Sequence, residues 1–391
     1  MDESRPPLFT RRFFTMCGFT FTVFLSAFQL LPVVPFHILE LGGSTFAAGL
    51  FLAFLTYSSA LSAPLTGALG DRLGKRVVLL VCSLVLSGFL AVYAVVPGYR
   101  LLLALVLVHG VFWSGLLSAS SAYMTDFIPE SRRAEGIGYW GMSTMLAVAV
   151  APSVGFFFHA RGWVVVCTVT ALLNLAMAGI AWSLPVEPVR EPHAAREPLR
   201  LQGLVEWRVV GVSMSLFLVS FGYGGITSFA ALFAERSGVA PKGIFFTVFA
   251  LVVLLTRVFA GRIADEVGHR RFVMPCFVLT SAGMALLAAA TSRAGMVVAA
   301  AVFGLGFGSL YPAFAAHVVK HVDPRRRGAT FGGILAAFDT GIGTGSMTLG
   351  ALIEMRGFAT AYGVAAFLSA LALPLFIFME GRFLKRPPAP G

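Results

Sequence analysis

The chain of 391 residues is 58% hydrophobic and only 12% charged, and its mean hydropathy is +0.85. A soluble globular protein carries about 25% charged and about 45–50% apolar residues, so this composition excludes that class and predicts an integral membrane protein. The net charge of +11 would suit a nucleic-acid partner. The Lys and Arg residues lie in short loops between apolar runs, however, and form no continuous stripe, which argues against nucleic acid.

Long apolar runs account for most of the chain. A transmembrane helix needs about 20 apolar residues to cross a hydrocarbon layer of about 30 Å. We expect spans at residues 13–36, 45–69, 77–97, 101–124, 134–158, 163–184, 209–234, 243–262, 272–291, 294–319, 328–353 and 358–379. The predicted fold class is therefore an all-α integral membrane protein with twelve transmembrane helices.

The twelve spans form two sets of six, separated by a proline-rich, charged stretch from Pro185 to Arg208. Identical residues recur 194 or 195 positions apart in the two sets: Asp71 and Asp265, Glu40 and Glu235, Pro129 and Pro324, and Gly155 and Gly350. This pattern predicts a duplicated six-helix bundle, with one copy at 1–184, a linker at 185–208 and the second copy at 209–391. Parallel six-helix repeats are typical of secondary transporters that bind substrate near the bilayer midplane.

The distribution of Lys and Arg predicts the orientation of the chain. The termini and the even-numbered loops hold 22 of the 29 basic residues, whereas the opposite loops hold six. Both termini and the linker are therefore expected in the cytoplasm, with the protein in the inner or plasma membrane.

Two charged stretches interrupt the apolar sequence at equivalent places. The stretch "GDRLGKR" (Gly70–Arg76) follows the second span, and "ADEVGHR" (Ala264–Arg270) follows the eighth. Their glycines permit a tight turn between helices. Each stretch is either a membrane-anchored turn or a latch, that is, a charge cluster that forms in one conformation and breaks in another. The repeated aspartate favours the latch.

These stretches also carry a family resemblance. "GALGDRLGKR" from Gly67 and "GRIADEVGHR" from Gly261 resemble the loop signatures of the major facilitator superfamily, and the match covers essentially the whole chain. "LVHGVFWSG" (Leu107–Gly115) and "DFIPESRRAEGIGYWG" (Asp126–Gly141) are similar to a bacterial efflux branch for drugs, sugars and metabolites. The resemblance implies a monomeric rocker-switch transporter. It also implies a cytoplasmic latch formed by Gly67, Asp71, Arg72, Gly74, Arg76, Gly261, Asp265, Gly268 and Arg270.

The chain departs from the efflux pattern in two places. Efflux members commonly carry an arginine four residues before the glycine of the fourth span, where this chain has Val106 before Gly110. Their fifth span resembles "GPxxGG", where this chain has "APSVGF" (Ala151–Phe156). Pro152 and Gly155 remain, so the helix bend and close packing are still expected, whereas standard proton antiport is placed in doubt.

Asp339, in the eleventh span, is the strongest candidate for proton coupling. It lies about eleven residues into the span, which at 1.5 Å per residue is about 16 Å deep. An ionisable residue at that depth indicates a functional site by default, because burying a charge in hydrocarbon is costly. It must be protonated, paired or facing water. The alternative is a structural carboxylate bonded to neighbouring helices.

Arg257 and His109 are weaker candidates. Arg257, in the eighth span, either pairs with Asp339 or an anionic substrate group, or extends its side chain to the nearby interface. His109, in the fourth span, either carries protons or forms a neutral hydrogen bond between helices, and the second reading is the commoner one.

Aromatic and amide side chains give a candidate substrate cavity. Spans 1, 4, 7 and 10 line the cavity in the superfamily that the chain resembles. The corresponding candidates here are Phe28, Gln29, Trp113, Tyr123, Phe221, Tyr223, Tyr311 and Phe314. Such a wall suits an amphipathic or neutral small molecule, although many of the 37 phenylalanines must simply face lipid.

No enzyme, cofactor or metal chemistry is indicated. "GDRLGKR" is not a phosphate loop, because its glycines are four residues apart and Arg76 stands where Ser or Thr is required. The glycine strings "GLGFG" (Gly304–Gly308) and "GIGTG" (Gly341–Gly345) more simply allow close helix packing. The four cysteines are far apart and show no metal-ligand spacing.

Three functions therefore remain open from the sequence. The first is proton-coupled export of small amphipathic molecules. The second is an uptake symporter or uniporter for a sugar or organic acid, and the third is a lipid flippase.

Overall fold

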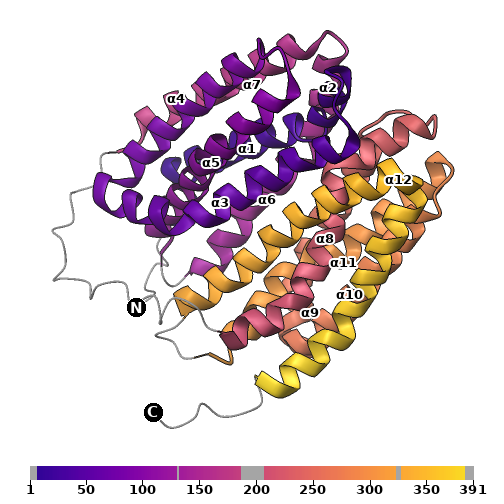
Figure 1. Ribbon diagram of the computed structural model, residues 1–391. Coiled ribbons are helices and arrows are strands. Elements are labelled where there is room, and N and C mark those ends of the chain that lie inside the picture. Colours follow the sequence, from indigo (N-terminus) through magenta and orange to yellow (C-terminus); the bar gives the residue numbers. More distant parts are fainter. Residues whose placement is uncertain (1–6, 130–131, 186–206, 323–326, 384–391) are drawn as a thin grey trace. The chain divides into compact units, whose positions relative to one another are not determined.

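In the computed structural model, residues 7–129, 132–185, 207–322 and 327–383 are described, and all their regular elements are helices (Figure 1). The helices are α1 (Arg11–Leu30), α2 (Val34–Glu40), α3 (Thr45–Leu73), α4 (Lys75–Tyr93), α5 (Tyr99–Phe127), α6 (Arg133–His159), α7 (Trp163–Ser183), α8 (Trp207–Arg236), α9 (Ile244–Val267), α10 (His269–Ala288), α11 (Arg293–Val319) and α12 (Arg327–Phe383).

The helices confirm twelve transmembrane spans. The segments α1 and α2 together form the first span, with a short interruption at residues 31–33. The helix α9 bends by 54° between Arg257 and Phe259 and is the eighth span. The helix α12 is long enough to cross the membrane twice, and its backbone breaks at Gly357, where φ is 81° and ψ is 174°. This left-handed conformation favours glycine, and it separates the last two spans.

Many hydroxyl groups of the spans are satisfied locally, as hydrocarbon favours. Many Ser and Thr hydroxyls donate to the backbone carbonyl one turn earlier, as Thr22 does to Gly18 at 2.9 Å and Thr280 does to Cys276 at 2.7 Å. The Thr10 hydroxyl accepts from the Phe13 N–H at 3.2 Å and so caps the start of α1. These residues therefore fit membrane helices without needing water.

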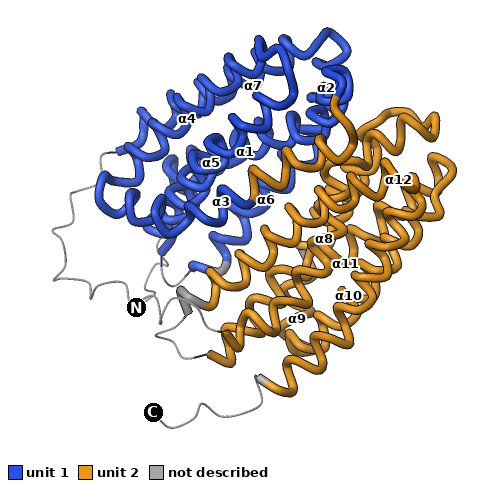
Figure 2. Tube along the Cα trace, in the orientation of Figure 1, with its two compact units in different colours: residues 1–42, 57–189 blue, residues 43–56, 190–391 orange. Residues whose placement is uncertain are grey.

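The helices divide into two compact units (Figure 2). Unit 1 comprises Met1–Gly42 and Tyr57–Val189, and unit 2 comprises Gly43–Thr56 and Arg190–Gly391. The predicted linker and the predicted repeat residue Pro324 lie largely or wholly outside the described residues, as do Glu130 and Ser131 of the efflux-like stretch.

One helix, α3, divides between the units, which the repeat boundaries do not predict. Its first turns belong to unit 2 because α12 holds them closely. The Thr45 hydroxyl donates to the Gly350 carbonyl at 2.8 Å, and the Phe46 N–H donates to the Glu354 carboxylate at 3.2 Å. A Cβ on Gly49 would lie 2.3 Å from the Ser346 carbonyl oxygen, so only a glycine allows this approach.

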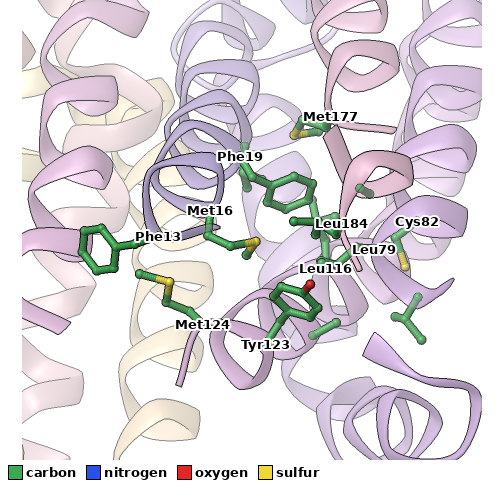
Figure 3. Packing of buried hydrophobic residues seen from close by; sticks show 14 of the residues in the cluster. Phe13, Met16, Phe19, Leu79, Cys82, Leu116, Tyr123, Met124, Met177 and Leu184 are labelled. Carbon is green, nitrogen blue, oxygen red and sulfur yellow. The ribbon is translucent and has the colours of Figure 1, made fainter. Parts of the chain in front are cut away.

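The core of unit 1 lies between α1, α4, α5 and α7. Figure 3 shows its buried side chains, among them Met16, Phe19, Leu116 and Tyr123. The core of unit 2 is a corresponding cluster from α8, α10, α11 and α12, in which Phe277, Phe314 and Phe376 are fully buried. Each unit therefore has an apolar core of its own, as an independently packed bundle requires.

Glycines make the closest helix contacts in unit 2. A Cβ on Gly345 would lie 1.8 Å from the Phe221 carbonyl oxygen of α8, and one on Gly341 would lie 2.0 Å from the Ser220 hydroxyl. A Cβ on Gly306 would lie 2.5 Å from the Thr280 backbone nitrogen of α10. The glycine strings of these spans are thus confirmed as packing features.

Candidate functional site

Asp339 lies in the first half of α12, about 18 Å along the helix from Arg327 at 1.5 Å per residue. Within the described part of the chain it forms no hydrogen bond and no ion pair, and the alternative of a pairing with Arg257 stays a prediction. Its side chain is partly exposed.

Four partly exposed aromatic rings form a series of ring contacts that begins near Asp339. Tyr311 of α11 is close enough to interact with it electrostatically. The Tyr311 ring packs 5.1 Å from Phe338, and Phe338 lies 6.0 Å from Phe307. The Phe307 ring in turn stacks on Tyr223 of α8, with 4.4 Å between the centroids. We call Asp339 and these rings the Asp339 cluster. All of its residues belong to unit 2.

Tyr223 is the partly exposed position of an otherwise buried stretch of α8. From Val219 to Ala234, Tyr223 is the one residue of α8 that is not buried. Lipid-facing side chains of unit 2 are far more open, as Leu255 is at 67% and Phe367 at 63%.

Unit 1 holds a smaller aromatic group at the equivalent place. Phe28 of α1 stands 195 residues before Tyr223 and is also partly exposed. It packs 6.1 Å from Phe24, whose ring lies 6.2 Å from Trp113 of α5. The predicted cavity residues Phe28 and Trp113 therefore lie together.

The other predicted cavity residues are placed differently. Tyr123 and Phe314 are fully buried in the cores of units 1 and 2, and Phe221 is 5% exposed against α12. Gln29 is buried in unit 1 and donates from Nε2 to the Thr170 hydroxyl at 2.8 Å, while its Oε1 has no partner. These four side chains pack inside the helix bundles. A sequence does not reveal this, because core and cavity faces are both apolar here.

His109 sits in an apolar interior. It is buried between α4 and α5, with its Nδ1 3.2 Å from the Tyr93 hydroxyl and its ring 5.6 Å from Phe89. These contacts match the predicted alternative of a neutral interhelical hydrogen bond. Arg257 is partly buried on α9, just before the bend of that helix.

Each loop stretch turns at a glycine, and the two glycines have nearly the same backbone dihedral angles. Gly74 has φ 87° and ψ 138°, and Gly268 has φ 87° and ψ 135°. Because this is a left-handed conformation, the prediction of glycine-dependent tight turns is confirmed. Asp71 borders a recess of about 200 Å³ that is lined by Gly67, Gly70, Lys75, Ser118, Ala119 and Ala122.

The charged residues of the loop stretches form contacts within each unit. Lys75 forms an ion pair with Asp126 of α5. Asp265 lies 3.7 Å from His269 one turn later, and Arg262 pairs with Glu266 at 2.8 Å. Arg72 and Gly261 are exposed. The latch stays a prediction, since none of these contacts tests a change of conformation.

The arginines that end the two stretches bind different partners. Arg76 donates to the Ala181 and Trp182 carbonyls at the end of α7, and its guanidinium lies 5.4 Å from the Trp182 ring. Arg270 instead donates to Glu380 of α12 at 2.8 Å and 3.0 Å.

Glu380 is a polar centre that the sequence analysis missed. It is 3% exposed, and the Nε2 of His317 lies 2.9 Å from its Oε1. The signal was available, because Glu380 is an acid directly after the last apolar run. Its partners Arg270 and His317 could not be read from the sequence, since they are 110 and 63 residues away.

Pro152 and Gly155 lie inside α6, as predicted. Pro152 is buried within the helix, and a Cβ on Gly155 would lie 2.1 Å from the Gln29 carbonyl oxygen of α1. The described residues contain no group of three or more His, Cys, Asp or Glu side chains arranged to hold a metal ion.

Comparison with known proteins gives consistent matches over the whole length. The family model described as Major Facilitator Superfamily matches residues 16–243 and 212–391. The chain is 26% identical to the MFS-type transporter YhhS of Escherichia coli K12, over 96% of this chain and 93% of that protein. It is equally similar to YhhS of Salmonella typhi, over 97% and 94%.

Solved structures share the fold at lower sequence identity. A mutant of the nucleoside transporter NupG superimposes with a TM-score of 0.79 at 16% identity, covering 94% of this chain and 99% of that one. A bacterial homolog of the human lysosomal transporter Spinster gives 0.76 at 16% identity, over 98% and 100%. The human organic anion transporter MFSD10 gives 0.69 at 20% identity, over 95% and 100%.

Proposed function

This chain belongs to the Major Facilitator Superfamily, and we propose that it is a secondary active transporter that exports small amphipathic molecules in exchange for protons. Transport proceeds by rocker-switch alternating access of the two six-helix bundles. The chain works as a monomer in a bacterial inner membrane, with both termini in the cytoplasm, and the basic loops support that orientation.

The observation that carries this proposal is the Asp339 carboxylate. It lies deep within a membrane span, it is partly accessible, and the described residues offer it neither an ion pair nor a hydrogen bond. A carboxylate in such a place can take up a proton from one side of the membrane and release it to the other. The rings beside it offer an apolar surface to the transported molecule.

We further propose that the loop stretches act as the latch on the cytoplasmic side. Asp71 and Asp265 lie in the last turns of α3 and α9, just before the glycine turns, so they move with those helices. The recess beside Asp71 is large enough to admit a side chain from another helix. This supports a contact that forms in one state of the cycle and is lost in the other.

The test uses purified protein in liposomes with a pH-sensitive dye trapped inside. Amphipathic compounds and sugars are added in turn, and the wild type is compared with Asp339→Asn. We expect proton movement that depends on an amphipathic compound and that the variant loses.

Glu235→Gln is the matched control, because it removes an exposed carboxylate of unit 2 outside both the Asp339 cluster and the loop stretches. It should transport as the wild type does. If Asp339→Asn moves substrate and protons as well as the wild type, the proton-coupling role is wrong. Substrate movement without protons in both proteins would make the chain a uniporter.

Uptake of a polar nutrient is the second candidate. Val106 is fully buried and apolar where efflux members commonly have an arginine, and a nucleoside transporter shares the fold. Expressing cells that accumulate a labelled sugar, organic acid or nucleoside above the level of cells without the protein would favour uptake over export.

A further inference from the structure

The start of α10 and the end of α12 are joined by the buried carboxylate of Glu380. Arg270 of α10 donates from Nε to both oxygens of that carboxylate, at 2.8 Å and 3.0 Å. The Nε2 of His317 at the end of α11 lies 2.9 Å from Oε1. The Glu380 side chain is 4% exposed. This junction therefore fixes where the neighbouring residues of the two helix ends lie.

Two exposed arginines lie next to this junction. Arg271 is the residue after Arg270 on α10, and Arg382 lies two residues after Glu380 on α12. Successive residues of a helix are rotated by about 100°, so both arginines point away from the buried carboxylate. The two helix ends thus present two guanidinium groups at a similar level on the surface of unit 2.

Each arginine ends a face of exposed apolar side chains. Residues three or four positions apart on a helix share a face. The exposed residues with this spacing are Arg271, Pro275 and Val278 on α10, and Leu371, Pro374, Phe378 and Arg382 on α12. We call these seven residues the α10–α12 outer face.

The core lies on the opposite side of both helices. The rings of Phe277 and Phe376 are fully buried and pack against each other with 5.5 Å between the centroids. Val278 is 53% exposed and Phe378 is 59% exposed, so these side chains point out of the bundle. The α10–α12 outer face therefore belongs to the outside of unit 2, and its exposure comes from the packing of that unit alone.

The layout of this face matches the layout of a phospholipid. Guanidinium groups bind phosphate through paired, charge-assisted hydrogen bonds. The exposed apolar residues below them offer surface to acyl chains. This end of unit 2 is the end expected in the cytoplasm, and the cytoplasmic leaflet is the one that carries anionic lipids. A soluble anion would use the two arginines and leave the apolar residues without a partner.

The internal repeat shows that the fold does not require this charge. Arg76 of α4 stands 194 residues before Arg270, so the unit 1 equivalent of Arg271 is Val77. Val77 is itself 46% exposed. The same level of the other bundle thus presents an apolar side chain to its surroundings. A cation that appears in one copy only is best explained by a ligand of that copy.

We infer that the α10–α12 outer face binds an anionic glycerophospholipid. Its phosphate lies between Arg271 and Arg382, and its acyl chains follow the apolar residues of the two helices. A zwitterionic lipid fits less well, because the two arginines repel its ammonium group. The inference goes beyond the proposed function and does not depend on it, since lipid binding requires no transport.

The experiment titrates the purified full chain in a non-ionic detergent and counts bound lipids by native mass spectrometry. The probes are dioleoyl-phosphatidylglycerol and dioleoyl-phosphatidylcholine, which have the same acyl chains. A basic residue beside an anionic lipid contributes about 5-fold in affinity, so two predict a preference for phosphatidylglycerol of about 10- to 30-fold. Raising the salt concentration should reduce this preference.

Variants locate the site. Arg271→Gln and Arg382→Gln should each weaken phosphatidylglycerol about 5-fold, and the double variant should lose most of the preference. The matched control is the double variant Arg293→Gln and Arg356→Gln, which removes two exposed arginines from the other end of unit 2. It should bind both lipids as the wild type does. Because all four side chains are exposed, melting temperatures should stay close to that of the wild type.

Three results would overturn the inference. The first is equal binding of the two lipids to the wild type, which would mean that the face does not select by charge. The second is an equal loss in the control and in the double variant of Arg271 and Arg382, which would make the preference an effect of net charge. The third is displacement of phosphatidylglycerol by glycerol-1-phosphate at the same concentrations, which would make the face a site for a soluble phosphate.

Discussion

The two units make the same turn and use it differently. Gly74 and Gly268 have nearly the same backbone angles, and an arginine follows each glycine by two residues. In unit 1 that arginine donates to backbone carbonyls, whereas in unit 2 it donates to the buried Glu380. The repeat therefore preserves the backbone geometry of the turn, while the side-chain partners have diverged.

The middle spans of the two units also share backbone geometry but differ in their side chains. Unit 1 has Phe28 and Trp113 where unit 2 has Tyr223 and Phe307, but the acid Asp339 occurs in unit 2 alone, opposite Thr144 in the repeat. Two bundles with one fold thus have different chemistry. Substitutions at equivalent positions measure how far they have diverged.

The largest effect is expected at the contact between α8 and α12. Gly345→Ala would place a Cβ 1.8 Å from the Phe221 carbonyl oxygen, and backbone atoms cannot move aside cheaply. Overpacking of this kind destabilises by about 3 kcal/mol or more. The melting temperature of the purified variant measures the effect.

The repeat and the same helix both supply controls for this glycine. The equivalent residue of unit 1 is the exposed Val150, so unit 1 does not require a glycine at this position. Gly363→Ala, also in α12, adds a Cβ in open space and should leave stability unchanged or slightly raised. Equal melting temperatures for the Gly345 variant and the wild type would contradict the close packing.

A smaller effect is expected where the two arginines differ. Glu380→Gln leaves Arg270 and His317 without their carboxylate, and losing one member of a buried pair costs about 3–5 kcal/mol. The side chain of Arg270 is 40% exposed, which reduces the expectation to about 2 kcal/mol. Arg76→Gln removes hydrogen bonds to carbonyls and should cost about 1 kcal/mol.

Thermal unfolding of both variants compares these two sites. Adding Arg270→Gln to Glu380→Gln measures the coupling of the pair, because the double variant should lose less than the two single losses together. Strict additivity would show that the arginine and the glutamate do not stabilise each other.

The smallest effect is expected at the first residue after each loop glycine. Lys75 is 13% exposed and pairs with Asp126, so Lys75→Gln should cost about 1 kcal/mol. His269 is the equivalent residue of unit 2, and its partner Asp265 is 76% exposed. His269→Gln should therefore change stability by about 0.5 kcal/mol or less, which high salt would reduce further. A larger loss at His269 than at Lys75 would reverse this comparison.

Much of the fold could be predicted from the sequence because the membrane imposes strong rules. Twelve apolar runs of spanning length became twelve spans, with ends that differ from the prediction by a few residues. The glycines of the loop stretches became left-handed turns, since other residues rarely adopt that conformation. The loop residue Pro324 and most of the predicted linker lie outside the described residues.

The candidate site was predicted only in part. Asp339, Tyr223 and Tyr311 lie together, but Tyr123 and Phe314 belong to the cores. Hydropathy gives the depth of a residue along a span. It does not give the rotation of the helix, because core, lipid and cavity faces are all apolar in this chain. The partners of Phe338 and Glu380 likewise come from distant helices.

The sequence by itself determined the membrane class, the number of spans, the internal repeat and the turn glycines, because each depends on local composition or on backbone conformation. Only the tertiary structure decided which rings border Asp339, which carboxylate receives Arg270, and why α3 joins unit 2 through its first turns. Those features depend on which faces of distant helices meet, and that is set by packing between helices rather than by any one segment.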